Sequence, residues 1–161
     1  MSTTTNALTV SAPDGVPFVD TVREFDFPVE AVYRAHVDPA LIVDWLGPRG
    51  YVMDLERWDI VSGGGWSYVH RTEHGDFGFR GVVHTAREND FLLQTFEFLG
   101  APDQVSIESA TFEALPGGRS RVSVHATYPS MEARNGMVDN GMAEGMGQGY
   151  QQLEELLART A

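Results

Sequence analysis

A run of strand-like segments joined by short turns fills most of this chain, and one long helical pattern ends it. Seven segments either alternate apolar and polar residues or are rich in Val, Phe and Tyr, which is typical of strands. They are predicted at residues 18–27, 51–58, 66–72, 77–87, 91–99, 105–115 and 121–128. Turns rich in Gly, Pro, Asn and Asp separate the last six segments. Short turns between successive strands predict an antiparallel meander.

Two short helices are predicted between the first strand and the second. Pro28 opens a helical patch over residues 29–36, because proline is favoured at the first position of a helix. Asp38 caps a second short helix that extends through Trp45. From Ser130 the hydrophobic period becomes helical and stays so to the end, which predicts one long helix.

These elements predict an α+β fold, in which a curved antiparallel sheet of about seven strands surrounds a long C-terminal helix. Such a sheet has one apolar face to cover, and the last helix is the large element available to cover it. The 161 residues are enough for one domain. Residues 1–15 are expected to be a flexible lead, and residues 16–161 are expected to form the single domain.

The composition excludes several kinds of chemistry. The sequence contains no cysteine and no lysine, so it offers no thiol nucleophile, no zinc–thiolate site and no Schiff base. Its net charge of −12 argues against binding to nucleic acid or to anionic membranes. No apolar run approaches the roughly 18 residues of a membrane span, and no signal peptide is evident. We therefore expect a cytoplasmic location and no insertion into a membrane.

Motifs for cofactors and metals are not evident either. The run Gly63–Gly65 lacks the spacing and the lysine of a P-loop, and no dinucleotide-binding glycine motif follows a strand. His70 and His74 flank a turn and would not face one ion. We therefore expect neither a cofactor nor a metal site.

Hairpin registers predict which residues face the interior of the sheet. The turn at residues 74–75 would pair His70 with Phe79, and the next turn would pair Val83 with Phe96. Both registers place the same residues on one face. That inner face comprises Trp66, Tyr68, His70, Phe79, Gly81, Val83, Phe96 and Phe98. Such an aromatic face fits either a binding cavity or a solid core.

Three glycines spaced four residues apart lie in the last helical segment, at positions 141, 145 and 149. They run beside an apolar stripe that comprises Val138, Met142, Met146, Tyr150, Leu153 and Leu157. An interior glycine costs about 1 kcal/mol relative to alanine, so the three together cost roughly 3 kcal/mol. Glycine here either lets the helix approach the sheet closely or leaves open volume above it.

Candidate chemical groups are few. His70 is the histidine predicted to point inward, and Tyr68 shares its face, so His70 could act as an acid or base with Tyr68 as a hydrogen-bond donor. The alternative is that His70 is a satisfied core residue or one polar anchor in an apolar cavity. Arg57 shares the inward parity of Met53 and could pair with a ligand carboxylate or with a nearby acidic residue.

Several strings in the sequence resemble one known family. The stretch 23–41 (REFDFPVEAVYRAHVDPAL) resembles the opening of the domain found in activators of the ATPase of the 90-kDa heat-shock chaperone. Residues 44–48 (DWLGP) and 59–66 (DIVSGGGW) are similar to its Trp-Trp-Gly-Pro and Asp-x-Arg-x-Gly-Gly-x-Trp motifs, with Leu46 and Val61 as departures. Residues 135–153 resemble its Gly-Met…Gly-Trp…Leu ending, and the match covers residues 16–159.

This resemblance places the chain in the START/SRPBCC superfamily of helix-grip proteins, which are related to the birch pollen allergen. It implies a cavity between the sheet and the long helix. Functions in the superfamily range from lipid and hormone carriers to polyketide cyclases, antibiotic-resistance proteins and chaperone activators, so the fold alone does not choose one.

We expect a binding protein for a small hydrophobic or aromatic molecule. The expected ligand-binding residues are Trp45, Met53, Arg57, Trp66, Tyr68, His70, Phe79, Gly81, Val83, Phe96, Phe98, Met142, Gly145, Met146, Gly149 and Tyr150. The alternatives are a cyclase or hydrolase that uses His70 and Tyr68 in the same cavity, a chaperone ATPase activator, and a stress or antibiotic-resistance protein. An exposed sheet edge or the short helices could support a homodimer.

Overall fold

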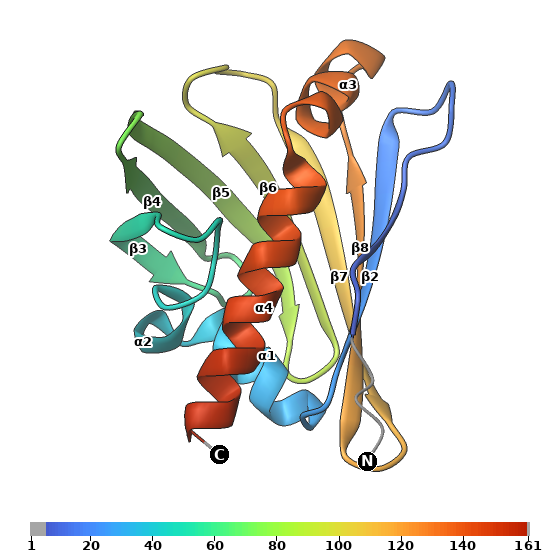
Figure 1. The fold of residues 1–161 in the computed structure, drawn as a ribbon. Helices are drawn as coiled ribbons and strands as arrows, with labels where there is room; N and C mark the ends of the chain where they lie inside the picture. Colours follow the sequence, from blue (N-terminus) through green and yellow to red (C-terminus); the bar gives the residue numbers. More distant parts are fainter. Residues whose placement is uncertain (1–5, 161) are drawn as a thin grey trace.

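The computed structural model describes residues 6–160 and has the predicted α+β architecture (Figure 1). Within these residues, one antiparallel sheet runs in the order β1-β2-β8-β7-β6-β5-β4-β3. The strands are β1 (Thr9–Ser11), β2 (Phe18–Phe25), β3 (Val52–Asp59), β4 (Gly65–Thr72), β5 (Gly75–Arg87), β6 (Phe91–Phe98), β7 (Ser106–Leu115) and β8 (Arg119–Thr127). The helices are α1 (Val29–Val37), α2 (Pro39–Ile42), α3 (Met131–Asp139) and α4 (Met142–Thr160).

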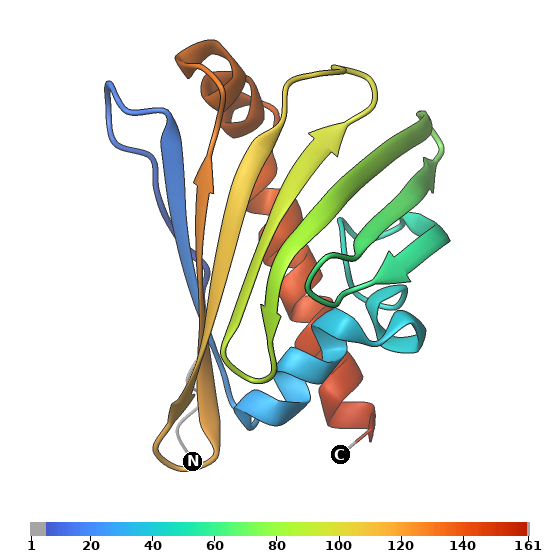
Figure 2. The same ribbon diagram turned by 180° about the vertical axis from the view of Figure 1, so that it is seen from behind.

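The long helix α4 lies across one face of the curved sheet, as the views from opposite sides show (Figures 1 and 2). The main core fills the space between them, and it includes Phe25 of β2, Val32 of α1 and Leu153 of α4, all fully buried. The predicted arrangement of a sheet around a C-terminal helix, with two short helices after a sheet strand, is confirmed.

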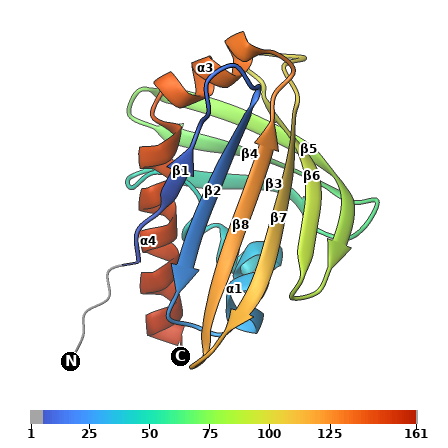
Figure 3. The same cartoon turned by 90° about the vertical axis from the view of Figure 1, so that its right-hand side faces the viewer.

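The predicted strand count is one too low for the described residues. Strand β1 lies within the stretch that was expected to be a flexible lead, and it pairs with β2 at the edge of the sheet (Figure 3). Val10 stands opposite Thr21 in this pairing. A strand of three residues carries too little alternation to stand out in the sequence. The first five residues of the expected lead lie outside the described residues.

The helical segment that begins after Ser130 is broken into two helices. The Ser130 hydroxyl accepts a hydrogen bond from the backbone N–H of Ala133 and so caps α3. Asn140 and Gly141 then separate α3 from α4, and Gly141 has a φ of +83°. Gly141 therefore lies between the helices, and the prediction of one unbroken helix is wrong because a left-handed residue ends an α-helix.

The predicted hairpin registers are wrong by two residues, although the predicted inner face is right. His70 pairs with Phe77 and not with Phe79, because the turn between β4 and β5 comprises residues 73–74. Val83 likewise pairs with Gln94 and not with Phe96. A shift of two residues keeps each side chain on its own face, since the faces of a strand alternate with a period of two.

Candidate functional site

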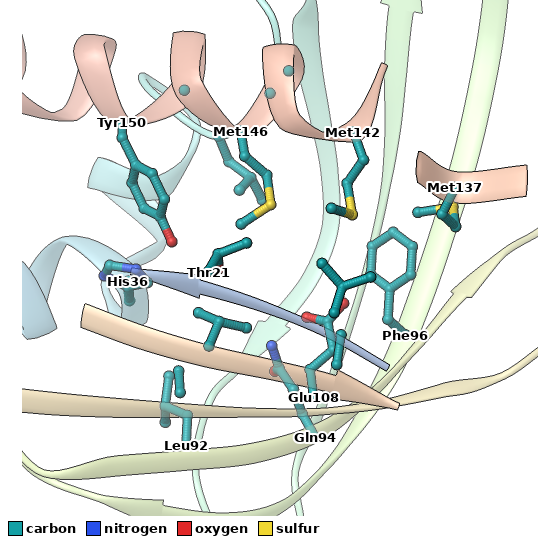
Figure 4. A pocket seen from close by; sticks show the side chains of 18 of the residues that line it. Thr21, His36, Leu92, Gln94, Phe96, Glu108, Met137, Met142, Met146 and Tyr150 are labelled. Atoms are coloured by element: carbon teal, nitrogen blue, oxygen red, sulfur yellow. The ribbon is translucent and has the colours of Figure 1, made fainter. Parts of the chain in front are cut away.

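A cavity of about 250 Å³ lies between α4 and the sheet (Figure 4). Most of its wall is apolar. The lining residues come from five strands (β2, β4, β6, β7 and β8), from α1, α3 and α4, and from the segments that follow α2 and β8. They are Val19, Thr21, His36, Trp45, Leu46, Gly47, Tyr68, His70, Leu92, Gln94, Phe96, Glu108, Ala110, Val124, Ala126, Tyr128, Met137, Met142, Gly145, Met146, Gly149 and Tyr150.

The floor of the cavity is built from small side chains on three neighbouring strands. Ala110 of β7 stands opposite Val124 of β8, which stands opposite Thr21 of β2. The next inward row pairs Ala126 of β8 with Glu108 of β7. Alanine, valine and threonine reach only a short distance from the sheet, so the space between these strands and α4 stays open.

Methionines and glycines of the helical segment form the roof. Met137 of α3 and Met142 and Met146 of α4 point toward the sheet in Figure 4. Methionine is unbranched and polarizable, so such a wall can adapt to ligands of different shape. Tyr150 lies further along α4, with its hydroxyl directed toward the floor (Figure 4).

The three helix glycines have three different explanations. Gly141 supplies the left-handed break between the helices. A Cβ at Gly149 would lie 3.3 Å from the carbonyl oxygen of Trp45, so this glycine lets α4 approach the loop after α2. A Cβ at Gly145 would lie 3.4 Å from Cγ of Pro48, an ordinary contact. Gly145 and Gly149 also line the cavity, so close approach and open volume both occur.

About half of the residues expected to bind a ligand line the cavity. They are Trp45, Tyr68, His70, Phe96, Met142, Gly145, Met146, Gly149 and Tyr150. Six other residues of the expected set do not line the cavity. They pack in the part of the interior nearer to β3, β4 and β5. They are Met53, Trp66, Phe79, Gly81, Val83 and Phe98.

This second group forms a solid aromatic core. The Trp66 ring stacks on Tyr68 with the centroids 5.4 Å apart, and the Phe79 ring also stacks on Tyr68, at 5.2 Å. Phe98 packs against Phe79 at 5.3 Å. Gly81 leaves room for the Trp66 indole, because a Cβ added at this position would lie 2.5 Å from Cε2 of Trp66. The aromatic inner face is therefore core at one end and cavity wall at the other.

The predicted inward position of Arg57 is wrong. A β-bulge between Leu55 and Arg57 inserts one residue into β3. After the bulge, residues that would have faced inward face outward, and the reverse. Trp58 consequently takes the inward position, opposite Trp66. The Arg57 guanidinium lies on the surface, where its Nη2 is 3.5 Å from a carboxylate oxygen of Asp59.

His70 lines the cavity but is also held by the loop after α2. Its Nε2 donates a hydrogen bond to the Leu46 carbonyl at 3.2 Å. Burial lowers the pKa of His70, and this hydrogen bond only partly opposes the effect. The imidazole is therefore neutral at pH 7, with Nδ1 as its unprotonated nitrogen. Burial also raises the pKa of Tyr68, so its hydroxyl stays protonated.

Four polar residues of the cavity were missed by the sequence interpretation. These are Glu108, Gln94, Thr21 and His36. The signal for two of them was strand parity, because Gln94 has the parity of Phe96 and stands opposite Glu108 on the inner face. His36 is held by a hydrogen bond from its Nδ1 to the Val32 carbonyl, and burial lowers its pKa to about 4.

Glu108 is the acidic group of the cavity. It is half-buried, and its side chain rises from β7 toward Met142 (Figure 4). Burial raises the pKa of the carboxyl to about 7. Its negative charge adds to the effect of burial in raising the pKa of Tyr68, Tyr128 and Tyr150. A carboxyl group that titrates near neutrality can bind a cation or exchange a proton with a ligand.

Comparison with known proteins identifies the family. A model of the family described as "Activator of Hsp90 ATPase homolog 1-like protein" matches residues 26–158. The chain belongs to this family. The predicted resemblance to activators of the chaperone ATPase is thus confirmed, and the helix-grip fold agrees with it. Comparison with the curated proteins gives no match.

Solved structures of similar fold cover nearly the whole domain of this family member. A protein from Rhodobacter sphaeroides is 23% identical, with a TM-score of 0.85, over 94% of this chain and 99% of the other. One from Mycobacterium smegmatis is 24% identical, with a TM-score of 0.85, over 95% and 98%. The AHSA1 protein from Silicibacter pomeroyi is 19% identical, with a TM-score of 0.73, over 89% and 99%. These identities establish a shared fold.

Two further findings concern residues 6–160. None of the helices there has both the length and the apolar character needed to span a membrane. No group of three or more histidine, aspartate or glutamate side chains in this part of the chain is placed to hold a metal ion.

Proposed function

We propose that this family member binds a small apolar or aromatic molecule in the cavity between α4 and the sheet. The observation that carries the proposal is a mostly apolar space of about 250 Å³ beneath α4, open where Thr21, Ala110 and Val124 present small side chains to it. Binding sites for small molecules are concave and mostly apolar, with a few polar groups that fix orientation. The cavity lies just below the roughly 300–1,000 Å³ of drug-sized sites, which favours a ligand of one or two rings.

Filling the cavity tests this proposal. Ala110→Leu would place a larger side chain on the floor, and Ala114→Leu makes the same change at an exposed position of the same strand. We expect neutral apolar compounds, among them indole, butylbenzene and 3-phenylpropan-1-ol, to raise the Tm of the natural protein and of Ala114→Leu. Ala110→Leu should lose this effect. The proposal is contradicted if no compound raises the Tm, or if Ala110→Leu responds like the natural protein.

A cyclase- or hydrolase-type enzyme is the second candidate, favoured by the presence of both His70 and Tyr68 in the cavity wall. Their ring centroids are 4.8 Å apart. Because Nε2 of His70 is engaged by Leu46, proton transfer would use Nδ1, and Tyr68 would act as a hydrogen-bond donor. Turnover of p-nitrophenyl acetate that is lost in His70→Gln, while 3-phenylpropan-1-ol still binds, would support it. Unchanged turnover in His70→Gln would remove this pair from the chemistry.

Activation of a chaperone ATPase is the role suggested by the name of the family. No feature of the cavity bears on it. The test is the ATPase rate of an Hsp90-type chaperone at saturating concentrations of this protein, and an unchanged rate would dismiss the role.

A further inference from the structure

Glu108 has no partner for its carboxyl group among the described residues. None of them donates a hydrogen bond to it or forms a salt bridge with it. Glu97 on the neighbouring strand β6 is buried and has partners: Nε of Arg80 lies 2.7 Å from its carboxylate, and the backbone N–H of Asp103 donates to it at 2.8 Å. Glu108 is half-buried in the cavity wall, where an ionised carboxylate without a partner is disfavoured, so a cation placed beside it would stabilise its charged form.

The cavity provides no positive charge of its own at neutral pH. The sequence has no lysine, and no arginine lies among the described residues that line the cavity. The titratable groups that face the same space are Tyr68 of β4, Tyr128 after β8, Tyr150 of α4, and the histidines His36 and His70. Burial keeps the histidines neutral and the tyrosines protonated. A ligand carboxylate would therefore meet only a like charge.

We propose that the ligand is a small apolar molecule that carries a cationic amine, and that Glu108 is its counterion. This inference rests on the proposed binding function. An ammonium group beside Glu108 would satisfy the carboxylate through charge-assisted hydrogen bonds. The rings of Phe96 and Tyr128 in the same wall can add cation–π attraction, which strengthens when the cation is desolvated. The net charge of −12 on the chain also draws cations toward the protein.

Thr21 marks where the other end of such a ligand would lie. Its side chain is buried, it lines the cavity, and its hydroxyl has no hydrogen-bond partner among the described residues. Thr21 belongs to β2, two strands away from Glu108 on β7 and one inward row further along, which places the two positions about 12 Å apart. A ligand with its amine at Glu108 and a second polar group at that distance would engage both residues.

Three probes of one shape test the charge preference: 3-phenylpropylamine (cationic), 3-phenylpropan-1-ol (neutral) and 4-phenylbutanoate (anionic). Their Kd values are measured at pH 8 by NMR titration with the natural protein, Glu108→Gln and Glu113→Gln. The last is a matched control, because Glu113 is exposed on the same strand. We expect the amine to bind at least tenfold more tightly than the alcohol to the natural protein and to Glu113→Gln, and the carboxylate to bind most weakly.

The preference for the amine should disappear in Glu108→Gln, while the alcohol binds that variant within threefold of the natural protein. Binding of the alcohol also shows that the variant is folded. The inference is overturned if the alcohol binds the natural protein as tightly as the amine, or if the preference survives in Glu108→Gln; the proposed function then still stands. If the alcohol does not bind the natural protein and neither do the other two probes, the inference and the proposed function both fall.

Discussion

Arg23 on β2 reaches across the core edge to Glu154 on α4, and its Nη1 lies 2.9 Å from Oε1 of that carboxylate. The guanidinium is 3% exposed, and it also packs over the ring of Phe25. This contact ties the strand that carries Thr21 to the helix that roofs the cavity. Neutralising Glu154 would leave a buried positive charge without its counterion.

We expect Glu154→Gln to lower the free energy of unfolding by about 2 kcal/mol. Breaking a fully buried pair costs roughly 3–5 kcal/mol, and the cost is smaller here because 30% of the Glu154 side chain is exposed. Its neighbour is the control. Glu155 pairs with Arg49 on the surface, so Glu155→Gln should cost less than about 1 kcal/mol. Urea unfolding of both variants at pH 7 measures the difference, and equal costs would contradict a structural role for the Arg23 pair.

Gly81 is required by the aromatic core. A Cβ there would lie 2.2 Å from the Thr95 carbonyl oxygen and 2.5 Å from the Trp66 indole, and neither can move freely. We expect Gly81→Ala to destabilise the protein by about 2–3 kcal/mol. At Gly78 on the same strand, a Cβ would meet only the end of the exposed Leu99 side chain, so Gly78→Ala should cost less than about 1 kcal/mol. Thermal unfolding would contradict this if the two variants were equally stable.

The glycines of the helical segment should respond in opposite directions to the same substitution. Gly141 has a left-handed backbone, so Gly141→Ala is expected to cost about 1–2 kcal/mol although open space surrounds its Cβ position. Gly147 lies inside α4 in open space with a helical backbone, so Gly147→Ala should stabilise the protein by about 0.5–1 kcal/mol. Destabilisation by Gly147→Ala would show that this glycine has a role besides propensity.

The sequence was sufficient for the faces of the sheet but not for its registers or bulges. Hydrophobic alternation identifies the inward side of β4 and β5 whatever the pairing, and so Tyr68 and His70 are inward even though each pairs two residues away from the expected partner. Arg57 fails because one inserted residue in β3 reverses the parity. A bulge depends on local backbone geometry that no residue type at this position announces.

The polar groups of the cavity were harder to predict than its aromatic wall. Glu108 sits at an inward position of β7, but a charged residue in a strand is ordinarily solvent-exposed, so its residue type gives no signal that it lines a cavity. The open volume itself depends on which inward residues are small over three strands that are adjacent in space but not in sequence. Ala110, Val124 and Thr21 form such a row only once the pairing is known.

Stability should depend on pH through Glu108. Because burial raises the pKa of its carboxyl from 4.5 to about 7, the folded protein binds more protons than the unfolded chain between these values, and stability is lost as the pH rises through this window. The loss is complete above pH 7 and amounts to about 3 kcal/mol.

His36 has the opposite effect, because its lowered pKa makes stability fall as the pH drops from 6.5 toward 4. Since the natural protein and Glu108→Gln both contain His36, its contribution cancels when the two are compared. The free energy of unfolding of Glu108→Gln relative to the natural protein should therefore increase from pH 5 to pH 8. Urea unfolding across this range measures it, with Glu113→Gln expected to differ from the natural protein by less than about 1 kcal/mol throughout. A constant difference for Glu108→Gln would mean that water or a neighbouring group already stabilises the charged carboxylate.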